Sequence, residues 1–311
     1  MDYNHKKELN KQTISMNLST KSLVVNSLHY FCIMQTFKKF LDFYLDASFH
    51  VAFSCFSLVQ ITGLHFTIPT SNSLSFFAFF GTIVGYNFVK YDALARAQKR
   101  QMRNELKAIF VLSVLSFIAV GFYFFQLKRM TQVASIFLLI LTLLYTLPFF
   151  PNQKNARNWA GVKIYVVALC WVGVTVVLPL LNASIPFDFY VFCYSIQRFI
   201  LVFVLILIFE IIDLAQDDPH LKTVPQQIGV KRTKNLGFIL ISVFCGLAIL
   251  NLKLSANFQV LPWISEIVIA GLIVLFLAFA NKKKAIYYTS FWVESIPIFW
   301  WLLFVFLNTL Q

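Results

Sequence analysis

The chain has 311 residues, of which 59% are hydrophobic and 17% aromatic, while only 13% are charged. A soluble domain carries about 25% charged residues, so the composition excludes an ordinary soluble globular protein. The net charge of +13 could suggest a nucleic-acid-binding protein. In so apolar a chain, however, an excess of Lys and Arg indicates membrane topology instead. The five cysteines are scattered and odd in number, so they imply no disulfide framework, and none shows metal-ligand spacing.

Apolar stretches that can each cross a hydrocarbon layer about 30 Å thick recur along the chain. Residues 1–40 are polar and basic and are predicted to be a cytoplasmic tail, whereas residues 41–311 are predicted to form one transmembrane domain. Turn-forming Pro and Asn residues separate several of the stretches. We therefore predict an all-α, multi-pass transmembrane helical bundle. Its nine expected spans are 42–62, 72–90, 108–126, 132–150, 163–181, 189–212, 237–252, 260–280 and 287–307.

The distribution of basic residues predicts which ends of these spans face the cytoplasm. With nine spans, 22 of the 26 Lys and Arg residues fall in the N-terminal segment and in the loops after the second, fourth, sixth and eighth spans. Only Lys128, Arg129 and Lys253 fall on the opposite side. By the positive-inside rule, the N-terminus and those loops are cytoplasmic. We expect an integral protein of a bacterial inner membrane.

An acid-rich segment, Glu210-Ile-Ile-Asp213-Leu-Ala-Gln-Asp217-Asp218, follows the sixth span. On a helix, Glu210, Asp213 and Asp217 lie at roughly 0°, 300° and 340° around the axis, so they share one face. Three like charges at the end of a membrane helix repel one another unless a cation lies between them. The pattern predicts a divalent-metal site, and the alternative is a solvated helix end without a ligand.

This segment resembles a motif of the UbiA-type family of intramembrane prenyltransferases. That family has nine transmembrane helices and two acidic motifs, in the cytoplasmic loops after helices two and six. Its second motif, roughly D-x-x-D-x-x-x-D followed by G-x-K-T-L-P, is similar to Glu210-x-x-Asp213-x-x-x-Asp217 and the later Lys222-Thr-Val-Pro225. The resemblance covers the chain from about residue 40 onward. It implies a UbiA-like fold, with Asp213 and Asp217 as catalytic metal ligands and Glu210 as a further ligand.

The first acidic motif of the family is only partly present. Its N-D-x-x-D-x-x-x-D pattern begins at Asn87, which matches, but the three carboxylate positions hold Phe88, Tyr91 and Ala95. Asp92 is one residue out of register, about 100° around the helix. The resemblance implies Asn87 and Asp92 as additional metal ligands. Taken alone, Asn87 is more typical of a polar packing residue.

The resemblance implies an enzyme that transfers the prenyl group of a prenyl diphosphate to a lipophilic or aromatic acceptor. Mg²⁺ would bridge carboxylate and phosphate oxygens, and basic side chains would bind the diphosphate. The alternatives are a UbiA-like protein that binds an isoprenoid or scaffolds a partner without transfer and, more weakly, a small transporter. The expected partners are these substrates and membrane lipid, with no nucleic acid. The expected diphosphate-binding residues are Lys154, Arg157, Lys163 and Lys222.

Three further ionisable residues lie in or near predicted spans. Arg198, within the sixth span, is expected to pair internally in a structural role, with Asp188 or Glu266 as candidate partners. His50 and His65 are isolated in the sequence, and no role is predicted for them.

Overall fold

The computed structural model describes residues 34–69, 71–97, 104–146, 161–215, 222–254 and 260–309. For residues 92–97, 145–146, 162 and 260–262, only the backbone is described. Throughout these ranges every regular element is a helix, which confirms the all-α prediction. The chain divides into two compact units, Met1–Asp46 and Ala47–Gln311. In the first unit the described residues form a helix, Met34–Asp46, and the predicted tail boundary at residue 40 stays a prediction.

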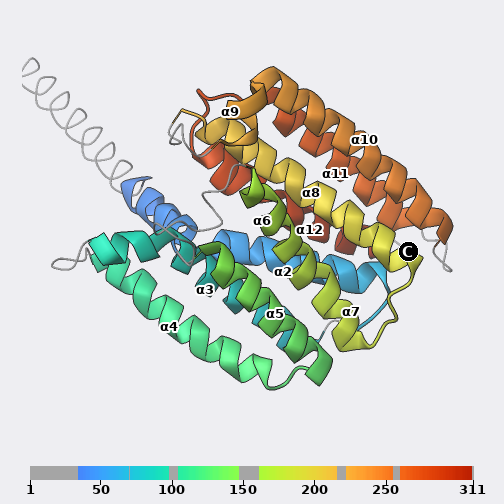
Figure 1. The fold of residues 1–311 in the computed structure, drawn as a ribbon, viewed down its shortest axis with the longest axis horizontal. Helices are drawn as coiled ribbons and strands as arrows, with labels where there is room; N and C mark the ends of the chain where they lie inside the picture. The colour runs from blue at the N-terminus through green and yellow to red at the C-terminus, as the bar shows by residue number, and fades with distance from the viewer. Residues whose placement is uncertain are drawn as a thin grey trace, which may run out of the picture. The chain divides into compact units, whose positions relative to one another are not determined.

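The second unit is a bundle of long helices (Figure 1). Each of the nine predicted spans overlaps a helical segment of this unit; the fifth span is built from three consecutive elements and the ninth from two. The elements are α2 (Phe49–His65), α3 (Asn72–Ala97), α4 (Asn104–Phe124), α5 (Arg129–Thr146), α6 (Val162–Val172), η3 (Gly173–Val177), α7 (Leu178–Ala183), α8 (Phe189–Asp213), α9 (Val224–Ile228), α10 (Val230–Leu254), α11 (Val260–Phe279), η5 (Tyr288–Val293) and α12 (Ile296–Asn308). The segments η3 and η5 are π-helical.

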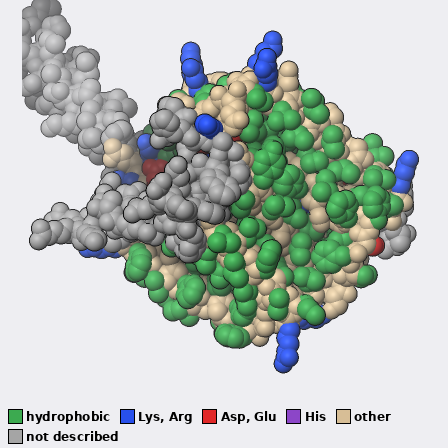
Figure 2. All heavy atoms as spheres, in the orientation of Figure 1, with side chains coloured by type: hydrophobic (Ala, Val, Ile, Leu, Met, Phe, Trp, Pro, Cys, Tyr) green, Lys and Arg blue, Asp and Glu red, His purple; other side chains and the backbone are tan. Residues whose placement is uncertain are grey.

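Five helical segments in the described ranges are long and apolar enough to cross a membrane, or six if Met34–Asp46 and α2 count as one span. Large hydrophobic side chains are exposed along them, as at Phe110, Phe117 and Phe122 of α4. Figure 2 shows such side chains over much of the visible face, with Lys and Arg projecting at its edges. The chain is therefore a multi-pass integral-membrane protein. The count of nine crossings stays a prediction.

The helix α8 is the most buried of the candidate spans and positions the acid-rich segment. It packs against α6, α10, α9 and η5. Leu201, Val204 and Ile208 of α8 share one core cluster with Ile241 and Phe244 of α10. Because lipid is as apolar as these side chains, close packing rather than water exclusion must hold membrane helices together. The C-terminal end of α8 is therefore held by dense contacts on several sides.

The fifth span is interrupted by η3, and the sequence gives a cause. Pro179 has no backbone N–H, so it cannot donate to the carbonyl of Thr175 four residues earlier. The hydroxyl of Thr62 in α2 donates to that carbonyl instead, at 2.6 Å. Inside a membrane such a carbonyl needs a partner, and here the proline creates a polar contact between α2 and η3.

Candidate functional site

The acid-rich segment begins in the last turn of α8. Glu210 is buried, and its Oε2 accepts a hydrogen bond of 3.0 Å from the backbone N–H of Val224. Since Val224 is the first residue of α9, Glu210 joins the end of α8 to the next helix. Asp213 is the last residue of α8 and is half-buried. Asp217 lies outside the described residues.

The Lys-Thr-x-Pro run forms the entry to α9. The backbone N–H of Thr223 donates to Gln226 Oε1 at 3.0 Å, as in a helix capping box. Pro225 lies in the first turn of α9, where a missing N–H costs nothing. Lys222 is exposed, has a positive φ of 49°, and its carbonyl accepts a hydrogen bond from the side chain of Gln227. Lys222 is thus held two residues from the contact between Val224 and Glu210.

Two substitutions of Glu210 test its structural role at the start of α9. An amide oxygen can accept the Val224 N–H, so Glu210→Gln is expected to keep α9 ordered. Glu210→Ala leaves that N–H unpaired and is expected to cost about 1–3 kcal/mol of stability. Thermal unfolding, together with hydrogen exchange at residues 224–228, measures both effects. Equal loss of α9 protection in the two variants would contradict the capping role.

On α3, Asn87 is buried, and its Nδ2 donates to Ser113 Oγ of α4 at 3.0 Å. Its Oδ1 has no hydrogen-bond partner among the described residues. A buried amide oxygen without a partner calls for an explanation such as a water or an ion. Asn87 therefore packs α3 against α4 with one end of its amide and leaves the other end available as an oxygen ligand.

The remaining predicted site residues are only partly described. Asp92 lies in α3, but its side chain is outside the described residues, and so are the whole of Lys154 and Arg157. Lys163 is half-buried in the first turn of α6. Within the described ranges no three His, Cys, Asp or Glu residues form a group that could hold a metal. The ligand set predicted from the sequence therefore stays a prediction.

A second polar cluster surrounds Arg198, fifteen residues before Asp213, or roughly 22 Å along α8. Arg198 is only 2% exposed. Its guanidinium group donates to one carbonyl and three hydroxyls and lies over two aromatic rings. The acceptors are the Leu58 carbonyl (3.2 Å), Thr62 Oγ1 (3.4 Å), Thr175 Oγ1 (3.5 Å) and the Tyr194 hydroxyl (2.7 Å), and the rings are those of Tyr194 and Trp300. The charge is thus solvated by neutral groups from several helices.

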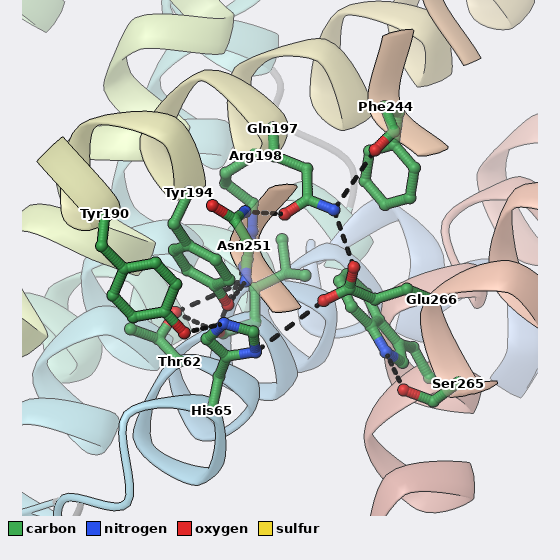
Figure 3. A network of polar contacts seen from close by, with 12 residues as sticks. Thr62, His65, Tyr190, Tyr194, Gln197, Arg198, Phe244, Asn251, Ser265 and Glu266 are labelled. Atoms are coloured by element: carbon green, nitrogen blue, oxygen red, sulfur yellow. Dashed lines mark hydrogen bonds and ion pairs between the residues drawn. The ribbon is translucent and has the colours of Figure 1, made fainter. Parts of the chain in front are cut away.

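Glu266 of α11 is the buried carboxylate of this cluster (Figure 3). Its Oε2 accepts from Gln197 Nε2 at 2.8 Å, and its Oε1 lies 3.8 Å from Nδ1 of His65. The other nitrogen of His65 contacts the Tyr190 hydroxyl at 2.7 Å. Asn251 of α10 donates to Gln197 Oε1 at 2.9 Å. The cluster therefore ties α2, α8, α10 and α11 together.

These contacts revise two expectations about individual residues. Asp188 caps α8 by accepting from the Val191 N–H at 2.9 Å, so it serves the helix N-terminus. His65, for which no role was predicted, is a central member of the cluster. Tyr190, Tyr194 and Arg198 are spaced four residues apart and so share one face of α8. That polar stripe is the sequence signal that could have revealed the cluster.

The fold can be compared with known proteins. No family model and no curated protein matches the chain. An apo structure of a UbiA homolog from Aeropyrum pernix K1 matches with a TM-score of 0.62 at 16% identity, over 84% of this chain and 98% of that one. A UbiA homolog from Archaeoglobus fulgidus bound to GPP and Mg²⁺ matches with a TM-score of 0.54 at 14% identity, over 86% and 99%. The same homolog bound to DMAPP and Mg²⁺ matches with equal values. The chain therefore has a UbiA-like fold, as the sequence resemblance predicted.

Proposed function

We propose that the chain is a prenyltransferase that binds a prenyl diphosphate with Mg²⁺ at the C-terminal end of α8. It transfers the prenyl group to a lipophilic or aromatic acceptor. The observation that carries the proposal is the placement of Glu210 and Asp213 in the last turn of the most buried span of a UbiA-like fold. Solved UbiA homologs of this fold are bound to GPP or DMAPP with Mg²⁺, which supports the same ligand class here.

The donor chemistry of the candidate ligands fits a hard divalent cation. Asp213, Asp217 and Asp92 offer carboxylates, and Asn87 offers an amide oxygen that is buried without a described partner. These are the oxygen ligands that Mg²⁺ takes. Glu210 has one oxygen committed to α9, so its second oxygen is the one available to a metal. When bound, Mg²⁺ would neutralise the diphosphate as it becomes the leaving group.

Basic side chains would bind the phosphate oxygens, and apolar side chains would surround the prenyl group. Lys222 lies just before α9, and Lys163 lies in the first turn of α6. Together with Lys154 and Arg157, they would donate to phosphate oxygens. Leu207, Ile208 and Ile211, just before and after Glu210, are fully buried. An apolar surrounding is what an allylic diphosphate needs if its reactive carbon is to be kept from hydrolysis.

A second function is favoured by one specific observation. The three carboxylate positions of the first motif hold Phe88, Tyr91 and Ala95. A UbiA-like protein that binds an isoprenoid diphosphate, or scaffolds a partner, without transferring the prenyl group would need fewer metal ligands. Saturable binding without product formation would favour this second function.

Equilibrium binding of geranyl diphosphate tests the ligand class. The purified full chain in lipid nanodiscs would be titrated in Mg²⁺ and, separately, in EDTA. We expect saturable binding in Mg²⁺ and affinity weakened at least about 10-fold in EDTA, because carboxylates bind phosphate only through a metal. Absence of binding under both conditions would contradict the proposal.

A further inference from the structure

The helix Met34–Asp46 carries its apolar and its polar side chains on opposite faces. At 100° per residue, counted from Met34, the apolar and aromatic side chains fill an arc from roughly 180° to 20°. This arc includes Phe37, Phe40, Leu41 and Tyr44. The helix is therefore strongly amphipathic, which is typical of a helix that lies at a boundary between an apolar and an aqueous phase.

The charged residues of this helix follow a definite order around its axis. Lys38 and Lys39 lie at roughly 40° and 140°, at the two borders of the polar face, and Asp42 and Asp46 lie between them at roughly 80° and 120°. A lysine stem can lie along an apolar surface while its ammonium group reaches the level of lipid phosphates. The aspartates lie farthest from the apolar arc. The charge pattern therefore fits a bilayer surface, with lysines at the phosphates and carboxylates toward water.

The apolar face is open in the first turns of the helix. Met34, Phe37 and Phe40 are 68%, 66% and 68% exposed. Large apolar side chains that are grouped on one face of a helix and left this exposed mark a surface for a membrane or a protein partner. The exposed residues of the polar face in the same turns, Lys38 and Lys39, allow the helix to meet an apolar phase from one side only.

The helix is separate from the first predicted span. Ser48 has a left-handed backbone with a φ of 62°, and α2 begins at Phe49. The 17 residues of α2 already fall within the length that crosses a bilayer. If Met34–Asp46 continued that span, two lysines and two aspartates would enter the hydrocarbon layer, where charged side chains are costly. A position at the membrane surface keeps all four charges in contact with water or headgroups.

The position of the helix in the chain identifies its partner as lipid. Only Ala47 and Ser48 separate it from α2, and two extended residues reach at most about 7 Å. The helix is thus tethered next to the end of a predicted membrane span, where phospholipid surrounds it at high local concentration. Since it carries equal numbers of lysines and aspartates, its attraction to the bilayer comes from apolar insertion and does not require anionic lipid.

We propose that Met34–Asp46 is an interfacial helix that binds phospholipid at the boundary between headgroups and acyl chains. Phe37 and Phe40 insert among the upper acyl chains, and Lys38 and Lys39 reach the phosphates on either side. The helix anchors the start of the transmembrane domain and sets the depth at which α2 enters the bilayer. This inference goes beyond the proposed prenyl transfer and does not depend on it.

Spin-label accessibility in nanodiscs of zwitterionic phosphatidylcholine tests the position of the helix. The full chain, with its five cysteines replaced, would carry one label at Phe37 or Phe40 on the apolar arc, or at Gln35 or Lys39 on the polar face. We expect the labels at Phe37 and Phe40 to be accessible to oxygen and protected from a water-soluble nickel chelate, about 5–10 Å below the headgroups. The labels at Gln35 and Lys39 should be accessible to the chelate.

Three patterns of accessibility would overturn the proposal. Chelate access at all four positions would place the helix in water, and lipid exposure at all four would make it part of a broken span. Protection of Phe37 and Phe40 from both reagents would mean that protein, from this chain or a second copy, covers the face. Thermal unfolding verifies that the labelled variants keep the fold. Photocrosslinking of the unaltered chain to a diazirine-bearing phosphatidylcholine should modify Phe37 or Phe40, and its absence there would also contradict the proposal.

A matched pair of substitutions tests whether the apolar face drives the insertion. With the label at Phe40, Phe37→Asp is expected to bring the label into contact with the nickel chelate, because a carboxylate on the apolar arc opposes insertion. Gln35→Asp places the same charge on the polar face and should leave the depth of the label unchanged. Equal depths in the two variants, or insertion that occurs only in anionic bilayers, would overturn apolar insertion as the cause of binding.

Discussion

Replacing Asp213 with Asn is expected to weaken the Mg²⁺-dependent binding of geranyl diphosphate by about 100-fold or more. The substitution keeps the size of the side chain and removes the negative charge. Even residues that only support metal ligands cost about 10- to 100-fold when they are changed, so loss of a direct carboxylate ligand should cost at least the upper value. Titration of Mg²⁺ at fixed geranyl diphosphate measures the effect, which should appear as a higher Mg²⁺ requirement.

The matched control is Asp188→Asn, the same change at the opposite end of α8. Asp188 caps the helix N-terminus through the Val191 N–H, and Asn caps about as well as Asp. This variant should bind geranyl diphosphate like wild type. Equal affinities in Asp213→Asn and Asp188→Asn would exclude Asp213 as a metal ligand.

Replacing Arg198 with Ala is expected to destabilise the protein by about 3–5 kcal/mol. The change removes a buried cation and leaves the Tyr194 hydroxyl and the Leu58 carbonyl without their donor. Thermal or denaturant unfolding in detergent measures the loss. Arg232→Ala, at an exposed arginine of α10, should change stability little.

A double variant shows whether Arg198 and Glu266 compensate each other. Removing one buried charge leaves the other without a compensating charge. The double variant Arg198→Met with Glu266→Gln is therefore expected to be more stable than Arg198→Met alone. Within the described part of the chain, Arg198 and Glu266 form no hydrogen bond or ion pair with each other; the carboxylate reaches the cluster through Gln197 and His65 (Figure 3). Strictly additive losses would mean that the two charges act independently.

The helical fold could be predicted because apolar runs of membrane length are a strong signal. The sequence placed α8 correctly, ending at the acid-rich segment. It missed the break at Ala47 and Ser48, where the first predicted span is divided, because Ser48 adopts a left-handed conformation that its residue type does not reveal. Pro179 was visible in the sequence, but the partner of the carbonyl that it frees, Thr62, lies in a distant helix.

The candidate site was harder to predict than the fold. Spacing alone brought Glu210 and Asp213 together, yet it gave no sign that Glu210 caps α9, because Val224 is fourteen residues further along the chain. Arg198 is buried, as its place inside a span predicted, but carbonyl and hydroxyl groups accept its hydrogen bonds in place of the expected partners Asp188 and Glu266. Its hydroxyl and carbonyl acceptors, like the place of His65, depend on helix packing that one sequence does not display.

Prenyl transfer itself is the most direct test of the central claim. Purified protein in nanodiscs would be incubated with radiolabelled prenyl diphosphates of several chain lengths and a membrane lipid extract, with Mg²⁺ or with EDTA. We predict a labelled lipophilic product that requires both Mg²⁺ and Asp213. No Asp213-dependent product from any chain length would contradict the prenyltransferase assignment.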